Sequence, residues 1–132
     1  MFTRYIVTIL PSGRTLPHPV AGHSSRTDRY ELPGYAVIIE TPDDPTGSYL
    51  AIERPAEGRL TITEGHPIRT GAPGLPWSGI YNQVIIDAAA GELRLHNDTF
   101  GLLACYFAQS DGALGISNSL RLLRRGGSLG VD

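Results

Sequence analysis

Hydrophobic and polar positions along this chain fall into short runs that suit β-strands better than helices. The runs are rich in β-branched and aromatic residues, and most of them end at proline, glycine or aspartate turn residues. Eight segments fit this description and are expected to be strands: residues 4–10, 35–40, 48–53, 59–64, 80–87, 92–97, 103–109 and 113–117. The pattern therefore predicts a mostly β fold.

The segments between these runs contain most of the residues that favour turns and loops. Residues 54–58 form a glycine-containing loop of hairpin length, and residues 110–112 read Ser-Asp-Gly, which favours a tight hairpin turn. Residues 65–79 are marked by proline and glycine and are expected to be a loop. Residues 11–34 are polar and proline-rich, and the pattern assigns them no element.

A single helix is expected, over residues 118–125, with Ser117 or Asn118 as its N-cap and Gly126 at its end. The two β-layers should pack face to face, with the apolar residues at strand spacing inside. Those residues are Ile6, Ile9, Val37, Ile39, Leu50, Ile52, Val84, Ile86, Leu93, Leu95, Tyr106 and Ile116.

Length and charge narrow the class of protein. The 132 residues suit one domain, expected over residues 1–125, with residues 126–132 as a linker or tail. Eleven basic and thirteen acidic side chains leave a net charge of -2, which argues against a nucleic-acid partner. The apolar run at residues 5–10 is too short for a signal peptide or a membrane span, so we expect a cytoplasmic protein without a membrane partner.

The side chains that could carry chemistry favour structural roles. Cys105 is the sole cysteine, which excludes an intramolecular disulfide, and we expect it to be buried and inert in a central strand. The chain contains neither a G-x-x-x-x-G-K-[ST] loop nor a G-x-G-x-x-G turn, so we expect no nucleotide cofactor. No metal site is expected either, because metal-binding helical spacing is absent among the four histidines, His18, His23, His66 and His96.

The region from residue 77 to residue 125 resembles a known family in the order and spacing of its motifs. The succession comprises a glycine and aromatic strand, an acidic turn, a strand leading to an aspartate, a glycine, an aromatic strand, an Asp-Gly hairpin, a serine and a leucine-rich helix. The residues that match it are Gly79, Tyr81, Asp87, Asp98, Gly101, Tyr106, Phe107, Asp111, Gly112, Ser117, Leu120, Leu122 and Leu123. This succession is similar to the end of the Ntn-type (class II) glutamine amidotransferase domain at the front of asparagine synthetases.

The resemblance implies an Ntn-hydrolase-like β-sandwich of the α+β family, and the departures from it imply that the glutaminase chemistry is lost. Family members place a nucleophilic cysteine directly after the initiator methionine, whereas this chain has Phe2 there. Asn97 and Asn118 replace the family's Arg and Glu, and the glutamine-binding segments and long helical middle have no counterpart. β-Lactam synthetases and lasso-peptide cyclases use degenerate front domains of this kind.

Three functions follow as expectations. The first is a non-catalytic glutaminase-like domain or subunit of an asparagine-synthetase-like, ATP-dependent amide-forming enzyme. Its partner would be the adenylating domain or a second copy of this chain, through contacts at Asp98, Leu102, Leu103, Leu120 and Leu123. The second is a stand-alone, small β-rich module that binds a ligand or a protein. The third is an Ntn hydrolase that uses Thr3 after removal of Met1 and Phe2.

Overall fold

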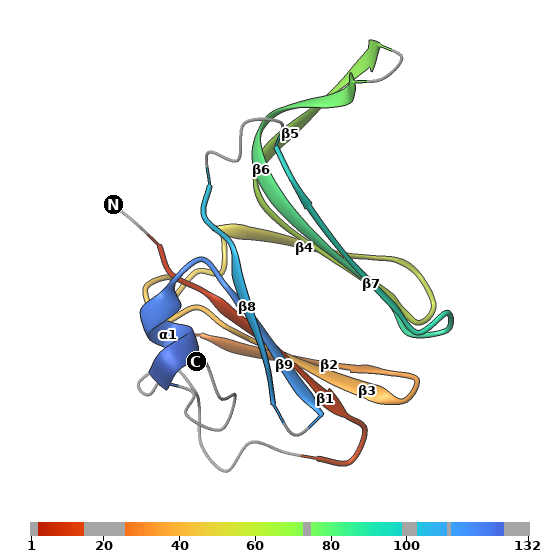
Figure 1. The fold of residues 1–132 in the computed structure, drawn as a ribbon, viewed down its shortest axis with the longest axis vertical. Coiled ribbons are helices and arrows are strands. Elements are labelled where there is room, and N and C mark those ends of the chain that lie inside the picture. The colour runs from red at the N-terminus through yellow and green to blue at the C-terminus, as the bar shows by residue number, and fades with distance from the viewer. Residues whose placement is uncertain (1–2, 15–25, 73–74, 99–102, 111, 126–132) are drawn as a thin grey trace. The chain divides into compact units, whose positions relative to one another are not determined.

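The computed structural model describes residues 3–14, 26–72, 75–98, 103–110 and 112–125 (Figure 1). It divides into two compact units, the first made of residues 1–48 and 105–132 and the second of residues 49–104. The described elements, in chain order, are β1 (Ile6–Pro11), β2 (Thr27–Leu32), β3 (Tyr35–Glu40), β4 (Leu50–Ala56), β5 (Arg59–Ala72), β6 (Leu75–Asp87), β7 (Glu92–Asn97), β8 (Tyr106–Ser110), β9 (Ala113–Ser117) and α1 (Leu120–Arg125).

The first unit is a five-stranded antiparallel sheet in the order β2-β3-β1-β9-β8. β1 lies at its centre, and Val7 sits opposite Ile39 of β3 and Ile116 of β9. Both faces of β1 are buried, which fits its nearly continuous apolar sequence. Helix α1 packs against β8 and β9, as Figure 1 shows in blue. The core cluster on this side consists of Ile6, Leu10, Ile38, Ala108, Ala113, Leu122 and Leu123.

The second unit is a four-stranded antiparallel meander in the order β4-β5-β6-β7. Ile62 of β5 lies opposite Ile52 of β4 and Val84 of β6, so these apolar residues share one face of the sheet. Leu60, Ile62, Val84 and Ile86 are buried on that face. The predicted hairpin between β4 and β5 is present, with an irregular register between Glu53 and Ala56.

The loop predicted over residues 65–79 is wrong, because both strands continue through it. β4 pairs with β5 as far as Glu64 and β7 pairs with β6 from Asn82 onward, whereas residues 65–72 and 75–81 pair with each other. We call this two-stranded extension the β5–β6 arm. Its outer edges carry no neighbouring strand in the described part of the chain, so a proline such as Pro67 interrupts no ladder there.

Two glycines allow the arm to form. Gly65 and Gly79 both have positive φ, at 85° and 96°. A Cβ on Gly65 would lie 2.2 Å from the carbonyl oxygen of Ile80, and one on Gly79 would lie 2.1 Å from that of His66. A side chain at either position would clash with the facing strand, so the close approach of the two strands requires glycine.

The predicted mostly β fold with one short helix is confirmed, and the chain forms two antiparallel sheets. The face-to-face packing of the two layers stays a prediction. The predicted interior is wrong at Leu93, Leu95 and Tyr106, which are exposed, while Ile52 is half-buried. Leu93 and Leu95 lie on β7, and Tyr106 lies on β8. Each of these strands is at the edge of its sheet, where a neighbouring strand on one side only leaves apolar side chains less covered. The remaining predicted core residues are buried.

The start of the β8 strand also differs from the prediction. The strand was expected from residue 103, but β8 begins at Tyr106, so Cys105 precedes it. Cys105 is half-buried, and β8 is an edge strand of its sheet. The expected burial of Cys105 in a central strand is therefore wrong.

Candidate functional sites

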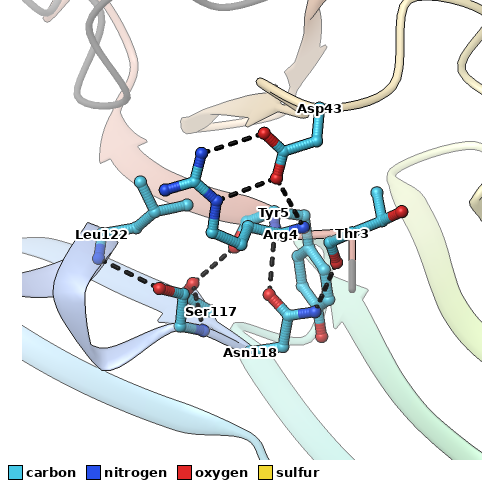
Figure 2. Close-up of polar contacts among 8 residues, drawn as sticks. Thr3, Arg4, Tyr5, Asp43, Ser117, Asn118 and Leu122 are labelled. Carbon is cyan, nitrogen blue, oxygen red and sulfur yellow. Dashed lines mark hydrogen bonds and ion pairs between the residues drawn. The ribbon is translucent and has the colours of Figure 1, made fainter. Parts of the chain in front are cut away.

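The first described residues of the chain are held by a polar cluster that we call the N-terminal clamp, made of Arg4, Asp43, Ser117 and Asn118 (Figure 2). Asn118 is buried and directly follows β9, and its side-chain amide both accepts and donates a hydrogen bond. Its Oδ1 accepts a hydrogen bond from the Tyr5 N–H at 2.9 Å, and its Nδ2 donates to the Thr3 carbonyl at 2.8 Å. The asparagine thus pairs with the backbone as a neighbouring strand would.

Ser117 continues this arrangement. Ile6 is paired with Ser117 in the sheet, and the Ser117 hydroxyl donates to the Tyr5 carbonyl. The same hydroxyl accepts from the Ser119 N–H at 2.9 Å. One serine therefore joins the start of β1 to the turn that leads into α1.

The N-cap of α1 is Ser119, and the predicted caps Ser117 and Asn118 are wrong. The Ser119 hydroxyl accepts from the Leu122 N–H at 3.3 Å, the contact that an N-cap makes with the third helical residue. Helix α1 begins at Leu120, two residues later than predicted. Ser117 and Asn118 are not available as caps because their side chains bind the start of the chain.

Arg4 and Asp43 close the clamp with a bidentate ion pair. Arg4 Nε lies 2.8 Å from Asp43 Oδ2 and Arg4 Nη2 lies 2.9 Å from Oδ1, while the Arg4 N–H also donates to Oδ2 at 3.2 Å. The hydrogen bond from Arg4 lowers the pKa of Asp43 below its ordinary value, although partial burial opposes the shift. Hydrogen bonding to Asp43 likewise raises the pKa of Arg4. Fork geometry of this kind fixes orientation as well as charge.

A second polar cluster lies in the second unit, around the carboxylate of Glu64. Glu64 is only 2% exposed and sits opposite Asn82 in the β5–β6 register. The Tyr49 hydroxyl donates to Glu64 Oε2, and Asn82 Nδ2 donates to Oε1 at 3.1 Å. Two donors therefore compensate the burial of this carboxylate.

The amide of Asn82 also binds the chain that leaves this unit. Its Nδ2 lies 3.2 Å from the Ala104 carbonyl and 3.4 Å from the Leu103 carbonyl. The cluster thereby links the root of the β5–β6 arm to residues 103 and 104. The cluster has a structural role, since its hydrogen bonds join four segments of the chain: Tyr49, β5, β6 and residues 103–104.

The structure describes four of the five residues expected to contact a partner, and these four differ in exposure. Asp98 is buried, and its N–H donates to the Tyr81 carbonyl at 3.0 Å. Leu103 is half-buried, Leu120 is exposed, and Leu102 lies outside the described residues. Leu123 belongs to the core beneath α1, so the expected apolar surface at Leu123 is wrong.

The sequence analysis missed several candidate functional residues, although the sequence pattern could have indicated some of them. Glu64 continues the inward alternation of Leu60 and Ile62, so its position alone marks it as a buried carboxylate. Phe107 is exposed next to Tyr106, although the sequence placed their strand at the centre of a sheet. The partners of Arg4 and Asn118 lie about 40 and 115 residues away along the chain, a separation that no local motif signals.

Other site types are not seen in the described residues. Within them, no group of three or more His, Cys, Asp or Glu residues is placed to hold a metal ion. None of the described helices is long and apolar enough to cross a membrane. No family model matches the sequence, and the search of curated proteins gave no match either.

Proposed function

We propose that this chain is a non-catalytic, glutaminase-like scaffold that supports an asparagine-synthetase-like, ATP-dependent amide-forming enzyme as its front domain or as a separate subunit. The observation that carries the proposal is the succession of motifs from Gly79 to Arg125, combined with Phe2 in place of the family's nucleophilic cysteine. The partner would adenylate a carboxylate, and the attacking amine would come from its substrate rather than from glutamine. A cytoplasmic location belongs to the same proposal.

The order of elements in this region supports the proposal. β6, β7, β8, β9 and α1 follow one another as the resemblance implies, with Asp87 ending β6, Asp98 following β7 and the leucine-rich helix last. A β-meander with tight turns can arise in unrelated folds, so this order supports the scaffold and not a particular chemistry.

The N-terminal clamp gives a structural reason for one departure from the family, Asn118 in place of its Glu. A glutamate at position 118 could accept from the Tyr5 N–H, but its carboxylate could not donate to the Thr3 carbonyl. Asparagine satisfies both groups. The clamp holds Thr3 by its backbone, which suits a fixed scaffold at the place where glutaminases keep a reactive amino terminus.

Glutamine hydrolysis tests the loss of chemistry. We expect the purified chain to release no ammonia from glutamine above a heat-denatured control, because its second residue offers no nucleophile. The intact mass of the purified chain separates the alternative of an Ntn hydrolase that uses Thr3. Retention of Met1 and Phe2 would exclude that route, whereas ammonia release by a chain that begins at Thr3 would support it and overturn the proposal.

A stand-alone binding module is the second candidate, and the β5–β6 arm favours it. Ile68 and Ile80 on this arm are 59% and 48% exposed, which is a feature of surfaces that meet another molecule. An Ile68→Ser/Ile80→Ser variant should lose such a partner without unfolding. A module of this kind would bind its partner equally well without a synthetase, whereas the scaffold acts only together with one. This difference separates the two candidates.

A further inference from the structure

The outer edge of β8 gathers the exposed apolar side chains of the first unit. Phe107 is 67% exposed, Tyr106 is 40% exposed, and Leu120, on the helix that packs against β8, is 43% exposed. Among the large apolar residues that the structure describes as exposed in this unit, only Tyr35 lies elsewhere. Tyr106 shares the helix-covered face with Ala108, and Phe107 projects from the opposite face. Apolar surface therefore flanks this edge on both faces of the sheet.

Among the described strands, none pairs with β8 on the side away from β9. In the described part of the sheet β8 is the terminal strand and pairs with β9 from Tyr106 to Ser110. Alternate residues of an antiparallel strand direct their N–H and C=O groups to opposite neighbours. About half of the backbone groups of β8 are thus directed to a position where a further strand could pair.

β8 also lacks the features that protect the other edges in the described chain. Charged side chains, prolines and bulges normally keep an edge strand from pairing with another molecule. The edge strands β2, β4 and β7 carry such features. They are Asp28, Arg29 and Glu31 on β2, Glu53, Arg54, Pro55 and an irregular register on β4, and Glu92 and Arg94 on β7. The β8 sequence, Tyr-Phe-Ala-Gln-Ser, contains no charge and no proline. Among the terminal strands of the two described sheets, β8 is therefore the one suited to addition of a strand.

We propose that β8 pairs with β8 of a second copy of this chain, antiparallel about a two-fold axis, so that the two five-stranded sheets become continuous. Two-fold symmetry brings each strand against itself, which an uncharged strand tolerates without opposing like charges. A comparable pairing of β7 centred on Arg94 would bring two guanidinium groups together. The absence of charge in β8 thus favours a second copy of the chain over a partner chosen by charge.

The length of β8 determines the register. Pairing centred on Ala108 overlaps all five residues, with Tyr106 opposite Ser110 of the partner subunit. Phe107 then lies opposite Gln109 of the partner subunit, and this pair occurs twice, once on each side of the axis. Side chains that face each other in this way interact directly, so their charges can be used to test the pairing.

The experiment measures the mass of the complete chain by sedimentation equilibrium. We expect the wild type to associate reversibly to twice its 14.2 kDa at micromolar concentration. Phe107→Lys/Gln109→Lys opposes like charges in both pairs and should raise the dissociation constant about 100-fold. Phe107→Lys/Gln109→Glu opposes Lys to Glu in both pairs and should stay within about tenfold of the wild type. Leu95→Lys, an exposed leucine on the edge strand β7, is the matched control and should leave association unchanged.

The proposal fails if the wild type is a monomer at high micromolar concentration, or if the two double variants associate equally well or equally poorly. Both substituted side chains are exposed, and circular dichroism of each variant verifies its folding. The dimer does not rest on the proposed scaffold role. It can therefore fail while the synthetase assay succeeds, or succeed while that assay fails.

Discussion

At the scale of single residues, the side chains with the most defined roles connect distant parts of the chain. Asn118, Ser117 and Asp43 together bind the backbone of residues 3–5, and Asn82 and Tyr49 bind Glu64. Sequence patterns could assign Ser117 and Asn118 to the junction between the last strand and the helix. They could not show which backbone groups these residues bind, because partners more than 100 positions apart are set by the tertiary fold.

Asn118→Asp tests the two-way hydrogen bonding of the N-terminal clamp. The carboxylate keeps the acceptor for Tyr5 but places a buried charge against the Thr3 carbonyl, so unfolding free energy should fall by about 2 kcal/mol. Urea denaturation measures the change. Asn97→Asp, at an exposed position, is the matched control and should change stability by less than about 0.5 kcal/mol. Equal effects of the two substitutions would mean that the clamp adds no stability.

The Arg4–Asp43 pair predicts a dependence of stability on acid. The pKa of Asp43 is lowered in the folded state, so the pair stabilises the fold above the unfolded pKa of about 3.9 and loses this contribution as pH falls through the folded pKa. Asp43→Asn should cost about 1 kcal/mol at neutral pH, a modest value because both side chains are partly exposed. The difference from the wild type should shrink below about pH 4. Glu57→Gln, at an exposed position, serves as the control, and a difference independent of pH would contradict the assigned charge pair.

At the scale of elements, strands whose apolar residues form a run or alternate regularly were predicted closely, whereas β2 and the β5–β6 arm were not. β3 and β7 have the predicted bounds. β2 was missed because it is an edge strand whose sequence, Thr-Asp-Arg-Tyr-Glu-Leu, carries charged residues where a buried strand has apolar ones. The sequence predicts a loop at the β5–β6 arm because proline and glycine usually break strands. Both are tolerated in a two-stranded ribbon whose outer edges need no neighbour.

Alanine at Gly65 or Gly79 should disrupt the arm. Each substitution forces a residue with a side chain into positive φ and places its Cβ against a facing carbonyl oxygen. We therefore expect the unfolding free energy to fall by more than about 2 kcal/mol. Hydrogen exchange at the amides of His66 and Ile68 should accelerate at the same time, because the arm opens locally.

Gly91→Ala is the matched control for these substitutions. Gly91 also has positive φ, at 66°, but no atom lies within 4 Å of the Cβ that alanine would add. Its cost should therefore stay near 1 kcal/mol, the strain alone. If all three alanine variants lost the same stability, close approach of the two strands would not be the reason for glycine in the arm.

At the scale of the whole molecule, composition and patterning predicted the fold class but not the surfaces. The alternation of apolar residues identified which residues could face a core, and it was right for Ile6, Val37 and Ile116. It could not tell an edge strand from a central one, because strand order depends on pairing between distant segments. The exposure of Phe107 and Leu95 follows from that order. The surfaces proposed for assembly were for this reason visible only in the structure.

The proposed scaffold role depends on a partner, and amide formation by that partner tests it most directly. The measurement is the rate of ATP-dependent amide formation by an adenylating synthetase encoded in the same or an adjacent reading frame, with free amine as the nucleophile, in the presence and absence of this chain. We predict that the chain raises the rate or is required for it, and that glutamine cannot replace the amine, because Phe2 provides no glutaminase nucleophile. A rate unaffected by the chain, or amide formation driven by glutamine through this chain, would contradict the account.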